Sequence, residues 1–110
     1  MVTASLTPTE TDRGFTFALT VRNDGDDPVS MQFSDAQRVE FTAERDGEVV
    51  WQWSRGRMFG QALGTVDLDP GEETTFEGGW DDPPTGEFLV RGSVTATGTD
   101  ATDETTLTVG

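Results

Sequence analysis

The side chains in this sequence that could do chemistry are carboxylates, hydroxyls and arginines, because histidine, lysine, cysteine and tyrosine are all absent. Without them the chain cannot form a Ser-His-Asp triad, a thiolate nucleophile, a lysine Schiff base or a zinc site with nitrogen or sulfur ligands. Paired carboxylates and an all-oxygen calcium or magnesium site are the chemistries that remain. No motif supports a catalytic carboxylate pair beyond the abundance of acids. We therefore do not expect an enzyme.

Two acidic turns are the candidates for a cation: the segment 24–27, and Asp67 with Asp69. Oxygen ligands from loops are sufficient to hold calcium. Neither turn has the EF-hand spacing, which requires a glutamate at the last position of the loop. We expect no metal and no cofactor.

The charge of the chain restricts its partners. The sequence has 21 acidic residues against 7 arginines, which gives a formal net charge of −14. Such a surface repels phosphates, so we expect no nucleic acid and no anionic membrane as partners. No stretch approaches the roughly 18 apolar residues of a membrane span, and the first ten residues lack the features of a signal peptide. The expected partner is another protein.

The composition also resembles that of proteins from salt-loving microbes, because acidic residues, threonine and glycine are abundant while lysine is missing. The screening length shortens from ~10 Å at about 0.1 M salt to ~3 Å at about 1 M, which confines repulsion to neighbouring charges. A disordered acidic tail is the alternative, but it would contain few aromatic residues. Seven phenylalanines and three tryptophans are spread among the acids here, which favours a folded halophilic domain.

The elements that must position these residues are β-strands, because apolar and polar residues alternate with a period of two. Phe15, Phe17, Leu19 and Val21 show the pattern most clearly. Further alternating runs cover residues 2–6, 29–33, 39–43, 49–54, 65–68, 74–76, 87–97 and 104–109. The dipeptide Asp46-Gly47 is the strongest hairpin signal between them.

Eight or nine short strands predict an all-β fold, namely an antiparallel, immunoglobulin-like β-sandwich without a disulfide. We expect residues 1–110 to form a single domain, since about 100 residues can build one core. A closed barrel is the competing architecture. The pattern predicts no oligomeric state.

Five aromatic residues are predicted to form the structural core: Trp51, Trp53, Phe41, Phe76 and Trp80. Trp51 and Trp53 are two positions apart, which places both on one face of a strand. Tryptophan is also enriched in binding hot spots, so an exposed anchor for a partner is the alternative interpretation.

The candidate partner-binding surface is the locally basic segment with Arg55, Arg57, Met58 and Phe59. In so acidic a chain, this segment could dock an acidic partner or offer Met58 or Phe59 to an apolar pocket. The alternative is structural: the arginines offset neighbouring carboxylates, while Phe59 and Leu63 cover an open end of the sandwich.

An ordered set of motifs between residues 23 and 81 carries a resemblance. It includes Met31-Gln32-Phe33-Ser34, Val50-Trp51-Gln52-Trp53-Ser54, Phe59 with Gln61-Ala62-Leu63, and Leu68-Asp69-Pro70-Gly71-Glu72. Together these segments resemble the BsuPI-related intracellular proteinase inhibitor family, whose founding member inhibits a subtilisin-type serine protease.

The resemblance implies a cytoplasmic β-sandwich. We expect this chain to be an inhibitor that binds a subtilisin-type serine protease through an exposed loop surface. The family motif includes Phe59, which lies in the basic segment. The alternative function is a non-inhibitory, immunoglobulin-like interaction module of a halophilic cytoplasm.

Overall fold

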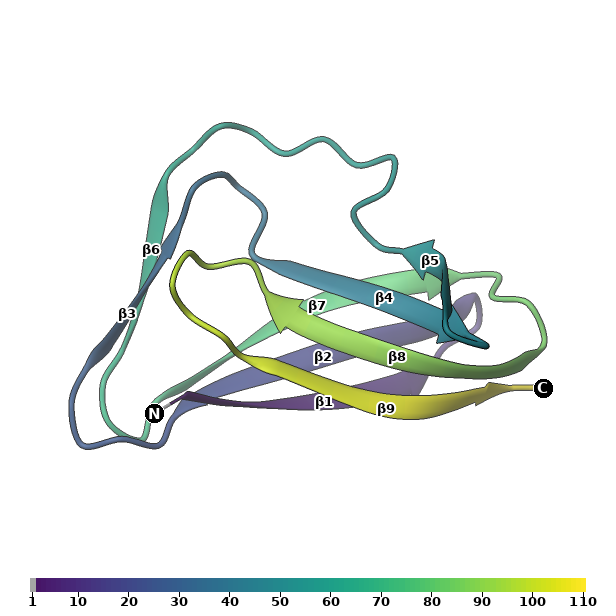
Figure 1. Cartoon of the computed structure of the whole chain (residues 1–110), viewed down its shortest axis with the longest axis horizontal. Helices are drawn as coiled ribbons and strands as arrows, with labels where there is room; N and C mark the ends of the chain where they lie inside the picture. Colours follow the sequence, from purple (N-terminus) through teal and green to yellow (C-terminus); the bar gives the residue numbers. More distant parts are fainter. Residues whose placement is uncertain (1) are drawn as a thin grey trace.

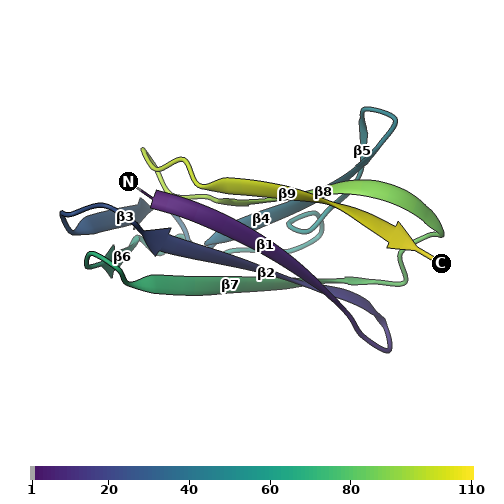
Figure 2. The same cartoon turned by 90° about the horizontal axis from the view of Figure 1, so that it is seen from below.

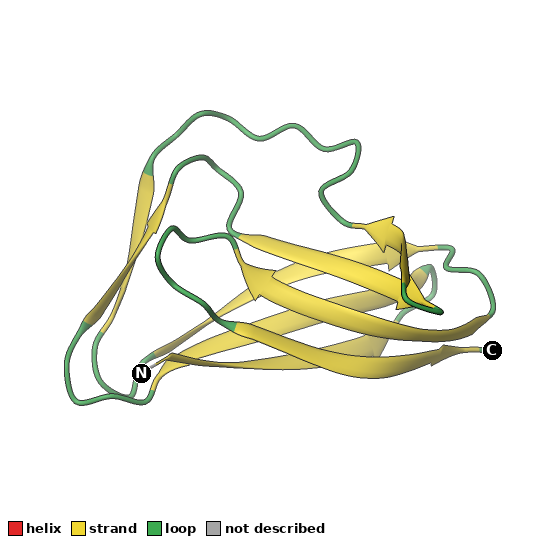
Figure 3. Ribbon diagram, viewed as in Figure 1, coloured by secondary structure: helices red, strands yellow, loops and turns green. Residues whose placement is uncertain are grey.

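A computed structural model describes residues 2–110, and every regular element in this range is a β-strand (Figure 3). The strands are β1 (Val2–Glu10), β2 (Gly14–Asn23), β3 (Val29–Phe33), β4 (Val39–Arg45), β5 (Glu48–Gln52), β6 (Gly64–Leu68), β7 (Glu73–Asp81), β8 (Gly86–Val94) and β9 (Thr102–Val109). The prediction of an all-β chain with eight or nine short strands is therefore confirmed.

The strands form two facing sheets and a two-stranded ribbon (Figures 1 and 2). One sheet has the order β1-β2-β7 and the other the order β5-β4-β8-β9, with all neighbours antiparallel. The chain changes sheet after β2, returns for β7 and changes again for β8, which is the expected immunoglobulin-like wiring. The ribbon of β3 and β6 lies at one end of the sandwich. Since the strand ladder is interrupted between the sheets, the fold is a sandwich and not a closed barrel.

The period of two explains how β2 forms the centre of its sheet. Phe17, Leu19 and Val21 are completely buried, as successive inward positions of a strand should be. On the outward face, the hydroxyl groups of Thr20 and Thr75 lie 2.9 Å apart across the β2–β7 pair. One face of β2 therefore supplies the core, and the other faces solvent.

The centre of the core is the ring of Phe41, which lies between two glycines. Phe41 is fully buried and pairs with Gly92 on the neighbouring strand β8. A Cβ atom at Gly92 would lie 3.0 Å from this ring, and one at Gly78 of the facing sheet would lie 2.9 Å from it. Phe17 packs against the same ring with a centroid distance of 5.7 Å. Both sheets thus omit a side chain where the phenyl ring needs the space.

The turn between β4 and β5 is the two-residue hairpin that the sequence predicts. Asp46 and Gly47 have φ angles of 53° and 82°, and Arg45 pairs with Glu48 across the turn. Positive φ at both central residues is typical of a type I′ turn, which matches the twist of the flanking strands. This hairpin places β5 at the edge of the four-stranded sheet.

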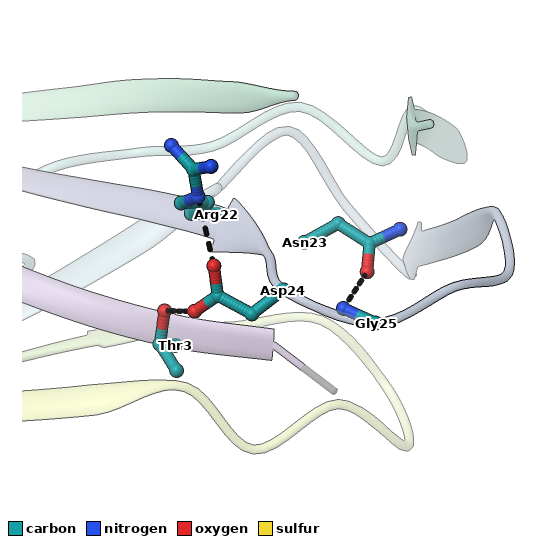
Figure 4. A network of polar contacts seen from close by, with 5 residues as sticks. All are labelled: Thr3, Arg22, Asn23, Asp24 and Gly25. Carbon is teal, nitrogen blue, oxygen red and sulfur yellow. Dashed lines mark hydrogen bonds and ion pairs between the residues drawn. The ribbon is translucent and has the colours of Figure 1, made fainter. Parts of the chain in front are cut away.

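A buried amide ties the β3–β6 ribbon to the sandwich. The Nδ2 group of the completely buried Asn23 donates to the carbonyl oxygens of Asp27 and Leu68 at 2.8 and 2.9 Å. Its Oδ1 atom accepts from the backbone N–H of Gly25 at 2.9 Å (Figure 4). Because each polar atom of this amide is paired, its burial is compatible with a stable core.

Beside Asn23, the carboxylate of Asp24 joins two strands at the surface. It accepts from the hydroxyl of Thr3 on β1 at 2.5 Å and from Nε of Arg22 on β2 at 2.8 Å (Figure 4). The hydrogen bond from Thr3 and the neighbouring guanidinium of Arg22 lower the pKa of Asp24.

Some strand ends differ from the alternating runs in the sequence. β5 ends at Gln52, so Trp53 and Ser54 follow the strand, and β8 ends at Val94 although the alternation continues to Thr97. The backbone N–H of Thr97 instead donates to the carbonyl of Gln32 in β3 at 2.8 Å. The chain leaves its sheet here because its hydrogen-bond partner lies on the ribbon, which a local pattern does not reveal.

The glycine at the core centre yields a stability prediction. Replacing Gly78 by alanine should destabilise the fold by about 1–3 kcal/mol, because the added methyl overlaps the Phe41 ring and Nε1 of Trp53. Gly79→Ala is the matched control, since its Cβ would meet only the carbonyl oxygen of Phe15 at an ordinary 3.7 Å. Urea unfolding of both variants checks this, and equal losses would contradict the packing argument.

The surface leaves most of the acidic charge without ion pairs. Within residues 2–110 the ion pairs join Arg22 to Asp24, and Arg91 to both Glu44 and Glu104. The formal net charge of −14 is therefore carried mainly by carboxylates that repel one another.

Salt should stabilise this protein. We expect the unfolding midpoint to rise steeply between about 0.1 M and 2 M KCl, because salt screens the repulsion between carboxylates. The triple variant with glutamine at the exposed positions Glu73, Glu77 and Glu87 should show a higher midpoint in low salt and a smaller rise. Thermal unfolding by circular dichroism measures both, and a flat midpoint for the unaltered protein would contradict the halophilic interpretation.

Candidate functional site

The candidate site is the connection of residues 53–63 between β5 and β6, which we call the β5–β6 loop. It leaves the edge of the four-stranded sheet and runs to the β3–β6 ribbon at the far end of the sandwich (Figure 1). Met58 is 98% exposed and Leu63 is 85% exposed, and both lie in this loop. The loop thus presents large apolar side chains to solvent, and such side chains are the usual anchors of protein interfaces.

The start of the loop is folded into two successive turns. The N–H of Arg55 donates to the carbonyl of Gln52 at 3.2 Å, and the N–H of Arg57 donates to the carbonyl of Ser54 at 3.0 Å. Gly56 between them has a φ of 81°, a conformation that glycine adopts without strain. These bonds define the backbone course immediately before Met58.

Arg57 is folded back onto the loop. Its Nε atom donates to the carbonyl oxygen of Trp53 at 2.9 Å, and its guanidinium lies 4.5 Å above the centre of the Trp53 ring. A cation over an indole is stabilised by the negative face of the ring. Arg57 therefore braces the loop, whereas the sequence suggested a charged contact for a partner or, as the alternative, an offset for neighbouring carboxylates.

Trp53 links the loop to the core. Its ring meets Phe41 edge-on at a centroid distance of 6.2 Å, and Phe59 packs on it at 5.8 Å. Phe59 is half-buried by this contact, while its neighbour Met58 points into solvent. The residues predicted as one binding surface thus differ in position: Phe59 is half-buried against Trp53, Arg57 lies over Trp53 but stays exposed, and Arg55 and Met58 are exposed.

The five aromatic residues predicted to form the core are buried to different extents. Phe41 and Trp80 are buried, and Trp51, Trp53 and Phe76 are partly buried and packed against the core. Trp51 stacks on Trp80 with centroids 4.7 Å apart and ring planes 14° from parallel. Because Trp51 lies on β5 and Trp80 on β7, this stack joins an edge strand of one sheet to an edge strand of the other.

An open hollow of about 500 Å³ lies beside the loop. It is lined by the three tryptophans, the two loop arginines and Asp81, together with Gln52, Gly56 and Gly79. The hollow therefore brings the sequence-predicted tryptophans and arginines together, while Met58 and Phe59 lie outside it.

Glu40 holds the base of the loop and was not singled out from the sequence. Its Oε1 atom accepts from the backbone N–H groups of Phe41 and Ser54 at 3.0 and 3.1 Å. Its Oε2 atom accepts from the Ser54 hydroxyl and from the side-chain amides of Gln52 at 3.0 Å and Gln37 at 3.4 Å. Gln37 and Phe41 are near Glu40 in sequence. Only the register of β4 against β5 brings Gln52 and Ser54 to this carboxylate, so a local pattern gives no signal for those two donors.

The environment of Glu40 changes its acidity. Partial burial raises the pKa of this carboxyl, but the hydrogen bonds from Ser54 and Gln52 and from the backbone N–H groups outweigh burial and lower it below its ordinary value. These donors favour the charged form because a carboxylate only accepts hydrogen bonds.

The acidic turns do not gather into a metal site. Across residues 2–110, no group of three or more carboxylates is placed to hold a metal ion. The same part of the chain includes no helix long and apolar enough to cross a membrane.

The structure is an immunoglobulin-like β-sandwich with large apolar side chains exposed on one loop. Residues 2–99 match the BsuPI family, which is described as intracellular proteinase inhibitor. The chain belongs to this family, and the resemblance found in the sequence is confirmed. The description is of an inhibitor, which is a non-enzymatic role with a protein partner.

A solved structure supports the fold. The crystal structure of Spo0M, a sporulation control protein from Bacillus subtilis, is similar with a TM-score of 0.58 at 15% sequence identity. The similarity covers 97% of this chain but only 48% of Spo0M, so the chain spans about half the length of that protein. No curated protein sequence matches the chain significantly.

The hydrogen bonds of Glu40 predict a pH dependence of stability. Because the folded-state pKa lies below the ordinary value of 4.5, the stabilisation is fully present above pH 4.5 and is lost as the pH falls through the folded pKa. The difference in unfolding free energy between the unaltered protein and Glu40→Gln should therefore shrink as the pH falls from about 7 to about 3.

Urea unfolding at constant high salt measures this difference at each pH. The free energy of unfolding of Ser54→Ala should change less with pH than that of the unaltered protein, because this variant removes one donor to the carboxylate and keeps the backbone N–H. Parallel stability curves for the unaltered protein and Glu40→Gln would contradict this assignment.

Proposed function

We propose that this chain is a single-domain cytoplasmic inhibitor of a subtilisin-type serine protease, and that the β5–β6 loop enters the active-site cleft. The family description supports the inhibitory role. The proposal extends that description to a protease type, a compartment and a surface.

The observation that carries the proposal is the exposure of Met58 on a loop with a structured base. Met58 is 98% exposed, and the backbone before it is held by two turns and by the packing of Arg57 and Phe59 on Trp53. A loop ordered before binding loses little conformational entropy in the complex, which favours tight inhibition. Met58 is then the apolar anchor, and Phe59 supports the backbone behind it.

Charge supports the same surface. Arg55 is exposed on the same loop as Met58, on a molecule whose formal net charge is −14. A local positive charge on an acidic protein selects the orientation in which this loop faces an acidic partner.

The second candidate function is a non-inhibitory interaction module in a halophilic cytoplasm. It is favoured by the edge strand β5, where Val49 and Val50 are each nearly half exposed. A partner could add a strand to this edge by backbone hydrogen bonding.

An inhibition assay separates the two functions. A subtilisin-type protease that tolerates about 1 M KCl is mixed with a micromolar excess of this protein, and hydrolysis of a peptide substrate is followed. We expect hydrolysis of the peptide to slow. An inhibitor keeps hydrolysis slow during a longer incubation, whereas a competing substrate is consumed and its effect disappears. Unchanged hydrolysis would overturn the inhibitory proposal and favour the module.

The anchor role of Met58 gives a sharper prediction. Met58→Asp should weaken inhibition by at least about 2 kcal/mol, or roughly 30-fold, because a charge replaces the side chain placed in an apolar pocket. Leu63→Asp is the matched control, since it makes the same change at another exposed apolar residue of the loop. Inhibition constants measure both, and equal losses would move the site away from the Met58 end of the loop.

A further inference from the structure

The carboxylate of Glu40 continues the pairing of β4 and β5 beyond the end of the strand ladder. The last ladder pair on this side is Thr42 with Gln52, and the N–H of Trp53 then donates to the carbonyl of Phe41 at 2.9 Å. At the next position, Ser54 donates its N–H and its hydroxyl to the Glu40 side chain instead of a backbone group. Glu40 thus binds the residue at which the chain leaves the sheet.

The chemistry of this site requires a carboxylate. Five donor groups point at the two oxygens of Glu40, and a carboxylate can accept all of them. A glutamine at this position has one oxygen, and its NH₂ group would face donors from Gln52 and Gln37. An isosteric amide therefore keeps the shape of the side chain but loses two or three of the five hydrogen bonds, according to which oxygen position its NH₂ group takes.

Ser54 transmits this restraint to the loop. Its carbonyl accepts the N–H of Arg57 at 3.0 Å, so the turn that precedes Met58 begins on the residue held by Glu40. Trp53, one position earlier, is held by its packing on Phe41. Glu40 and Phe41 are adjacent on β4 and face opposite sides, so one strand restrains the base of the loop from both sides.

We propose that Glu40 is the positioning residue of the β5–β6 loop: it fixes Ser54 and thereby the turn that presents Met58. The link to inhibition rests on the proposed function. The effect on the loop itself does not depend on any partner.

Trypsin tests this positioning role directly, because Arg55 and Arg57 are cleavage sites within the loop. The folded, full-length protein is incubated with trypsin in high salt, and mass spectrometry follows cleavage at each arginine. Glu40→Gln should speed cleavage at Arg55 and Arg57 by roughly tenfold or more, the factor expected when about 1.4 kcal/mol of local restraint is lost.

The matched control is Glu44→Gln, which makes the same change on the same face of β4, where the carboxylate lies 3.8 Å from Arg91. It should leave loop cleavage unchanged. Ser54→Ala is a milder variant for the case in which Glu40→Gln unfolds, and it should speed loop cleavage by a smaller factor.

Two results would overturn the positioning role. The first is loop cleavage of Glu40→Gln and Ser54→Ala at the unaltered rate. The second is an equal increase in the cleavage rate at the arginines outside the loop, which would show that the whole fold is loosened and not the loop alone. These arginines are Arg13, Arg22, Arg38, Arg45 and Arg91.

The inhibition assay then separates this inference from the proposed function. If the unaltered protein inhibits, Glu40→Gln should raise the inhibition constant in parallel with loop cleavage, and Glu44→Gln should not. If the unaltered protein fails to inhibit, the proposed function is overturned, while the trypsin result still decides whether Glu40 positions the loop.

Discussion

The packing of the Phe41 ring between Gly78 and Gly92 is the constraint on which the rest of the structure depends. The two glycines belong to facing sheets; a Cβ atom at Gly78 would overlap the ring at 2.9 Å, and one at Gly92 would press on it at 3.0 Å. Nε1 of Trp53 occupies the same space above Gly78, only 2.7 Å from where a Cβ would be. The contact that holds the sheets together therefore also locates the residue from which the β5–β6 loop starts.

The loop is ordered by two kinds of interaction that come from opposite faces of β4. Phe41 faces the core and packs on Trp53, while Glu40 faces outward and binds Ser54. Arg57 adds a cation above the same indole, so Trp53 is contacted from the core and from the loop. This arrangement combines an exposed apolar side chain with a defined backbone, which is the combination that binding through a loop requires.

Much of the fold follows from local patterns, whereas the division of roles within the site does not. The alternation around Phe17 and the dipeptide Asp46-Gly47 each predict an element that the structure contains. The segment with Arg57, Met58 and Phe59 has no strand or helix periodicity, so its residues could only be grouped by charge and apolarity. In the structure, Arg57 and Phe59 both contact Trp53, but only Phe59 is partly buried, and Met58 is 98% exposed.

The ordered motifs between residues 23 and 81 carried the resemblance to the family, whereas the choice of a sandwich over a closed barrel came from the strand pairing in the structure. The sequence by itself also determined the all-β class and the absence of the usual nucleophilic and zinc-binding side chains. These properties depend on composition and on short-range order, such as a period of two or a hairpin turn. Only the tertiary structure decided that Glu40 meets Ser54 and that Trp51 stacks on Trp80. Such contacts depend on strand register and on how the two sheets face each other, and neither is written in a local pattern.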